Sequence, residues 1–206
     1  MKTLVLLTAA TCFAHRLDEY LQATQLSVEK DRVHAQIFLT PGVAVFPVVF
    51  AGIDTDADHV LSTAEQRAYA ERVLGDLSLS VDGTPLRLRL VSAKFASPDE
   101  MQQGLGEIAI DFQADLPVNG GNRTLTFENH HQQRIAAYLV NCLVSRDPDI
   151  RLGTQHRNDS QSSYSLDYVQ TGAGSTRNLA ILAAMILAFF ARVAWLWRTR
   201  LLASKL

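Results

Sequence analysis

The chain has 206 residues, of which 48% are hydrophobic and 19% are charged. This length allows one domain with a substantial core, together with shorter segments outside it. The formal net charge of −2 argues against nucleic acid as a partner, because phosphate binding needs a basic surface.

Residues 1–14 are typical of a secretory signal peptide. Lys2 precedes an apolar run that is too short to span a bilayer, and small residues precede a cleavage site after Ala14. A buried N-terminal strand or helix, or lipoprotein cleavage before Cys12, are the alternatives. We therefore expect residues 15–170 to form an exported domain.

The exported domain is expected to be mainly β and β-sandwich-like. Short segments with alternating or β-branched apolar residues are separated by polar turns, as in a sandwich. In the clearest segment, 77–90, Asp82 and Gly83 are predicted to join two alternating runs as a hairpin. Once the signal peptide is removed, Cys142 is the only cysteine, so disulfides cannot hold this domain together. Residues 29–31 are predicted to form a hairpin turn between strands 21–28 and 32–39. The other predicted strands are residues 107–116, 123–129, 136–144, 150–153 and 164–170.

Two segments within the β pattern are predicted to be helical, residues 41–53 and 63–77. Pro47 is expected to kink the first helix, because proline cannot donate a backbone hydrogen bond. Ser62 or Thr63 is expected to cap the second helix, with Glu65 in its first turn.

The twelve residues 54–65 read DTDADHVLSTAE and join the two predicted helices. Asp54, Asp56 and Asp58 take the first, third and fifth positions, and Glu65 closes the segment. Four carboxylates this close would repel one another unless a cation neutralised them. Calcium prefers six to eight oxygen ligands, and a glutamate that binds through both oxygens favours calcium over the smaller magnesium ion.

Helix, acidic loop and helix together resemble the EF-hand family over residues 42–77. His59 occupies the sixth position, where the family has glycine, and the left-handed backbone needed there is strained for histidine. We therefore expect weak binding, and we find no second loop of this kind. The alternatives are an acidic turn that only caps a helix, and a loop that has lost its cation. The resemblance implies that the ligands are the side chains of Asp54, Asp56, Asp58, Ser62 and Glu65 and the backbone carbonyl of Val60.

Histidines offer a second possible metal chemistry. His130 and His131 are adjacent and would point to opposite faces of a strand, so a surface turn is favoured over a shared metal. His15 would begin the mature protein, where its imidazole and the free amine could bind copper or nickel. We find no catalytic motif, so we do not expect an enzyme.

Residues 179–197 are predicted to form a transmembrane helix. This segment is apolar apart from Arg192 near its end, and its two tryptophans suit the membrane interface. Basic residues are more numerous in 198–206 than before the span, which places that tail in the cytoplasm and the domain outside. Residues 171–178, TGAGSTRN, read as a flexible linker. A sorting tail that is removed after export is the alternative.

A weaker resemblance involves AHRLDEYLQATQLSV, TPG and RNDSQSSYSLDYVQ. They are similar to exported β-rich regions of bacterial nickel/cobalt-transporter-like or hydrogenase/urease-accessory-type membrane proteins. The predicted span has no histidine or acidic residue, so transport is not implied.

Together, these features predict a single-pass, membrane-anchored calcium-binding module in the cell membrane. Its main domain would be periplasmic or extracellular and would contact another membrane protein. The alternative is an accessory protein that handles nickel, cobalt or copper outside the cytoplasm.

Overall fold

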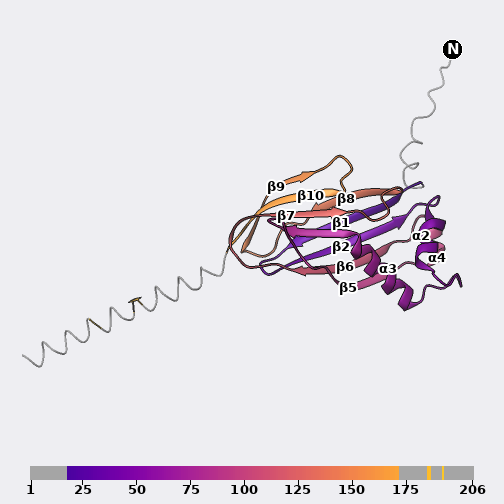
Figure 1. The fold of residues 1–206 in the computed structure, drawn as a ribbon, viewed down its shortest axis with the longest axis horizontal. Coiled ribbons are helices and arrows are strands. Elements are labelled where there is room, and N and C mark those ends of the chain that lie inside the picture. The colour runs from indigo at the N-terminus through magenta and orange to yellow at the C-terminus, as the bar shows by residue number, and fades with distance from the viewer. Residues whose placement is uncertain (1–17, 172–184, 187–191, 193–206) are drawn as a thin grey trace, which may run out of the picture.

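The computed structural model describes residues 18–171 together with residues 185, 186 and 192. This part of the chain is mainly β, with two five-stranded sheets and three short helices (Figure 1), which confirms the prediction that the domain is mainly β. The predicted signal peptide, and nearly all of the predicted linker, transmembrane helix and tail, lie outside the described residues. No helix within the described residues is long and apolar enough to cross a membrane.

The first sheet has the strand order β5-β6-β2-β1-β8. β1 and β2 form the hairpin predicted around residues 29–31, and β8 runs parallel to β1. Buried and more exposed side chains alternate along β1 and β2, so one face of the sheet lies in the core. The strand bounds are β1 Tyr20–Val28, β2 Arg32–Pro41, β5 Arg89–Phe95, β6 Ile108–Asp115 and β8 Ala136–Cys142.

The second sheet has the order β4-β3-β7-β10-β9, with all neighbours antiparallel. Its buried side chains join those of the first sheet in one hydrophobic cluster, which includes Phe112 from β6 and Phe127 from β7. The two sheets therefore share a single core. The strand bounds are β3 Leu77–Val81, β4 Thr84–Pro85, β7 Gly121–Asn129, β9 Ile150–Arg157 and β10 Ser163–Gln170.

The hairpin predicted over residues 77–90 forms only at its turn. Asp82 and Gly83 have positive φ angles of 51° and 76°, as a tight hairpin turn requires. The returning strand β4 ends after two residues, at Pro85, and the next strand, β5, pairs with β6 in the other sheet. The prediction of a second long arm was therefore wrong, because the chain crosses here from one sheet to the other.

The three helices gather at one end of the sheets (Figure 1). Their bounds are α2 Phe46–Ile53, α3 Thr63–Gly75 and α4 Pro98–Gln102. α2, α3 and the loop that joins them form a helix–loop–helix insertion between β2 and β3, beside the β core. A short loop connects α4 to β6.

The first two helices differ from their predicted limits in ways that have simple causes. α2 begins at Phe46 rather than at residue 41, and Pro47 lies in its first turn, where a missing N–H is tolerated. The expected kink was therefore wrong. α3 begins where predicted and is capped by Ser62, but it ends at Gly75 because Leu77 already belongs to β3.

Candidate metal site

The loop between α2 and α3 brings three aspartates together. Asp54, Asp56 and Asp58 each place one carboxylate oxygen within 4.8 Å of the others. The two helices that fix the loop ends are also tied to each other, since Arg72 of α3 donates a hydrogen bond to the carbonyl of Gly52 at 2.9 Å. This cluster could hold a metal ion.

Asp54 is the buried member of the cluster, with 5% of its surface exposed. Its Oδ2 accepts a hydrogen bond from the backbone N–H of His59 at 3.0 Å. Its Oδ1 is buried and has no hydrogen-bond partner among the described residues. A buried polar oxygen without a partner is costly, and more so if it carries charge. A cation placed among the three carboxylates would supply the missing partner.

Asp56 and Asp58 are exposed and shape the loop through local hydrogen bonds. Oδ1 of Asp56 accepts from the N–H of Asp58 at 3.3 Å, and Oδ1 of Asp58 accepts from the N–H of Val60 at 2.7 Å. The N–H of Asp58 lowers the pKa of Asp56, but desolvation and the carboxylates of Asp58 and Glu65 outweigh it and raise that pKa overall. Negative charge is therefore already crowded at this loop.

Glu65 closes the loop but is not a member of the three-aspartate cluster. Its Oε1 accepts from the N–H and hydroxyl of Thr55 at 2.6 and 3.1 Å, and its Oε2 from the N–H and hydroxyl of Ser62 at 3.1 and 2.8 Å. The hydroxyl of Ser62, followed by the N–H groups of Thr55 and Ser62, lowers the pKa of Glu65 to about 2. The carboxylate is therefore ionised at neutral pH and joins the two ends of the loop.

The two remaining predicted ligands are placed differently. Ser62 caps α3 by accepting a hydrogen bond from the N–H of Glu65 at 3.3 Å. The side chain of Val60 is exposed, which suits a residue that was expected to contribute only its carbonyl. Ligation by Val60, Ser62 and Glu65 stays a prediction.

The loop takes two left-handed backbone positions, at Ala57 and His59, with φ angles of 59° and 64°. The left-handed backbone expected at the sixth position is therefore present, although a histidine occupies it. The ring of His59 is exposed and lies parallel to that of Phe50, with centroids 6.2 Å apart. The side chain at this left-handed position therefore contacts α2.

His131 has a role that was not expected from the sequence. His130 is exposed, as in the predicted surface turn, but His131 is 1% exposed, so the surface prediction was wrong for His131. Its Nδ1 lies 2.7 Å from the Oδ2 of Asp76, and its Nε2 lies 3.1 Å from the hydroxyl of Tyr69. That hydroxyl lies 2.8 Å from the hydroxyl of Tyr20. This buried chain joins α3 to the first strand of the β core.

Burial lowers the pKa of His131 and outweighs the opposing effect of Asp76. The ring is therefore neutral at physiological pH, with one nitrogen facing the carboxylate and the other facing the tyrosine. Both nitrogens are occupied within the protein, which leaves neither for a metal. His15, the other histidine considered for metal binding, lies outside the described residues.

We compared the chain with known protein families, curated proteins and solved structures. No protein-family model, no curated protein and no solved structure matches the chain.

Proposed function

We propose that the loop of residues 54–65 binds one calcium ion in an EF-hand-like helix–loop–helix inserted in an exported β-sandwich-like domain. The observation that carries this proposal is the buried carboxylate of Asp54, which clusters with the carboxylates of Asp56 and Asp58 and whose Oδ1 has no partner among the described residues. A protein that buries such an oxygen beside two further carboxylates gains stability when it binds a cation. The ion supplies the missing partner of the oxygen and neutralises the repulsion between the carboxylates.

The full ligand set in this proposal includes Glu65, Ser62 and the carbonyl of Val60. Glu65 already sits at the closing end of the loop and is ionised, so it can exchange its hydrogen bonds to Thr55 and Ser62 for bidentate ligation. Six or more oxygens with one bidentate carboxylate favour calcium over magnesium. The left-handed His59 lowers the affinity, and a dissociation constant of about 10⁻⁴–10⁻³ M is typical of extracellular calcium modules.

The proposed role of the ion is structural. The loop connects α2 to α3, and α3 reaches the β core through Tyr69 and His131. Calcium would therefore fix the helical end of the domain, which residues 179–197 would anchor at the outer face of the cell membrane, near a membrane-protein partner. The nickel, cobalt or copper alternative loses support at His131, because both of its ring nitrogens are engaged internally.

Calcium titration of the full-length protein by calorimetry and thermal melting tests this proposal. We expect saturable binding that raises the melting temperature, with a much weaker response to magnesium. Asp54→Asn should abolish the response and, without calcium, should leave the protein as stable as the unsubstituted chain or more stable by about 1 kcal/mol, because it removes a buried, uncompensated carboxylate.

The chain offers a matched control for Glu65. Ser97 and Glu100 form the same capping box at α4 that Ser62 and Glu65 form at α3. Glu65→Gln should remove the calcium response, whereas Glu100→Gln should retain it, although both lose comparable helix caps. Equal calcium responses in the two variants, or no response of the unsubstituted protein at millimolar calcium, would reject the proposal.

A further inference from the structure

The outer face of the first sheet is divided into a polar half and an apolar half. Strand register aligns one polar row across β8, β1, β2 and β6, and the adjacent row across the same strands is apolar. The polar row consists of Asn141, Gln25, Gln36 and Asp111, and the apolar row consists of Leu139, Ala23, Phe38 and Ala109. A sheet face that meets only water is usually polar, so the apolar half needs a separate explanation.

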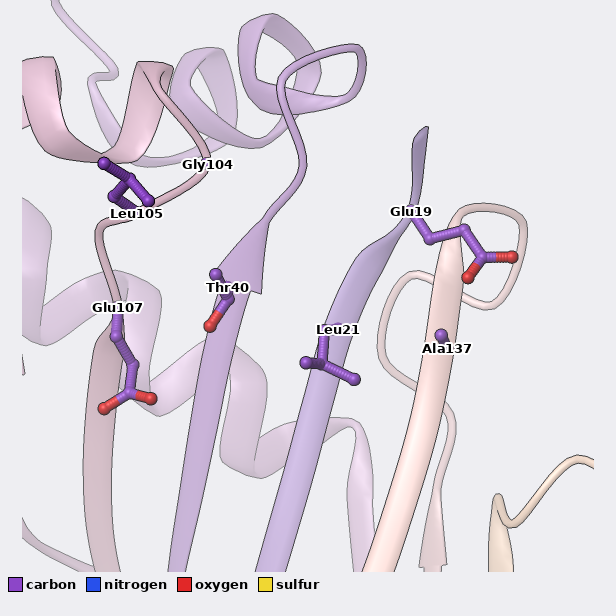
Figure 2. Close-up of a pocket in the computed structure, with 7 residues that line it drawn as sticks. All are labelled: Glu19, Leu21, Thr40, Gly104, Leu105, Glu107 and Ala137. Carbon is purple, nitrogen blue, oxygen red and sulfur yellow. The ribbon is translucent and has the colours of Figure 1, made fainter. Parts of the chain in front are cut away.

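A pocket of about 390 Å³ continues this apolar half toward the helical end of the domain. Figure 2 shows it above β1, β2 and β8, with the side chains of Leu21, Thr40 and Ala137 beneath it. Leu105, from the loop after α4, lies on one side. Apart from the hydroxyl of Thr40, the floor of the pocket is therefore apolar, Leu105 adds an apolar side chain at its edge, and the pocket is open to solvent.

The position of Leu105 is fixed although the residue is 77% exposed. Its N–H donates to the carbonyl of Glu100 at 3.0 Å, and the N–H of Gly106 donates to the same carbonyl at 2.8 Å. A side chain at Gly106 would come within 2.5 Å of the backbone N of Met101, and Gly104 has a positive φ of 70°. Two glycines thus hold Leu105 outward beside Leu21 and Ala137. Contiguous exposed apolar surface, unlike a single exposed side chain, marks interaction sites.

Two carboxylates flank the pocket from opposite sides, Glu19 before β1 and Glu107 before β6 (Figure 2). Neither side chain has an ion pair or a hydrogen bond among the described residues, and Lys94, which lies opposite Ala109, pairs with neither. Like-charge repulsion disfavours an anionic lipid surface as the occupant. A second copy of this face is also disfavoured, because it would bring the same carboxylates together.

We propose that this surface binds a partner polypeptide through an apolar side chain flanked on both sides by basic residues. The apolar side chain enters the pocket between Leu21 and Leu105. The basic residues pair with Glu19 and Glu107, which sets the orientation of the segment and excludes acidic partners. None of these residues belongs to the calcium loop, so this proposal stands independently of calcium binding.

The test is peptide binding to the full-length protein, measured by fluorescence anisotropy. The probes are two short synthetic peptides with a central phenylalanine, one with lysine at both ends and one with glutamate at both ends. We expect the lysine peptide to bind at least about tenfold more tightly, since two ion pairs replace two repulsions. The double variant Glu19→Gln/Glu107→Gln should remove most of this difference, and Leu105→Ser should weaken binding of the lysine peptide.

Glu71→Gln is the matched control, because Glu71 is an exposed carboxylate on α3 that does not line the pocket. It should leave the preference unchanged. Equal binding of both peptides, no binding of either at millimolar concentration, or a preference that survives the double variant would overturn the proposal.

A photo-cross-linking residue in place of Leu105 identifies the occupant directly in cells. Capture of a separate protein through an apolar, basic-flanked segment supports the proposal. Capture of a second copy, of lipid, or of residues 193–206 of the same chain would overturn it.

Discussion

The three-aspartate loop and the His131 chain both contain buried polar groups, but only one of the two is internally complete. His131 has a partner for each ring nitrogen, whereas Oδ1 of Asp54 has none among the described residues. A buried hydrogen-bond network in which every group has a partner makes the fold more rigid. The incomplete one leaves a buried carboxylate oxygen next to two further carboxylates, a group that could hold a cation.

The largest effect is expected from a substitution that breaks the complete network around His131. His131→Ala should lower the free energy of unfolding by about 3 kcal/mol, because it creates a cavity and leaves Tyr69 and Asp76 without their partner. His130→Ala, at the adjacent exposed residue, should change it by less than about 0.5 kcal/mol. Urea denaturation of the two variants measures the contrast. Similar losses in both would show that the buried chain does not join α3 to the β core in solution.

A smaller effect should appear when pH is varied. The folded-state pKa of His131 lies below its ordinary value of 6.5, so the unfolded chain binds a proton more readily. Its contribution to stability is complete above pH 6.5 and is lost as pH falls below that value through the folded-state pKa. Melting temperatures should therefore fall between pH 7 and pH 5. This slope should persist in His130→Ala and flatten in His131→Gln; a slope that is unchanged in His131→Gln would assign it to other groups.

Glu65 titrates in a separate range. Its pKa is lowered from 4.5 to about 2 by the bonds to Ser62 and Thr55. Its contribution is therefore complete above pH 4.5 and is lost only as pH falls from there toward 2. The slope between pH 7 and pH 5 thus reports on the histidine network without a contribution from the loop glutamate.

Local patterns in the sequence predicted much of the fold and of the loop. Alternation and turn residues identified the β1–β2 hairpin, and the spacing of the four acids identified the loop between two helices. The capping pair Ser97 and Glu100 could have revealed α4 by the same reasoning that found α3.

The remaining features depend on contacts between distant segments. β5 leaves the hairpin of β3 because β6 offers an open edge in the other sheet, and no local pattern encodes that choice. The burial of His131 requires Tyr69 and Asp76 to approach from a helix far away in sequence. The same holds for Asp54, since the spacing indicates a ligand but only the structure shows that it is buried and that its Oδ1 lacks a partner among the described residues.

The smallest expected effect concerns the strained position within the incomplete network. His59 has a φ of 64°, and glycine adopts that region without the steric cost paid by other residues. His59→Gly should tighten calcium binding about fivefold, equivalent to about 1 kcal/mol of relieved strain.

The loss of the contact between His59 and Phe50 works against this gain, so His59→Ala serves as the control that loses the ring and keeps the strain. Calorimetry should rank the affinities as glycine above histidine and histidine above alanine. If the glycine variant binds no more tightly than the alanine variant, the backbone at the sixth position does not limit affinity, and the contact between the loop and α2 becomes the determinant of how well the three carboxylates are held together.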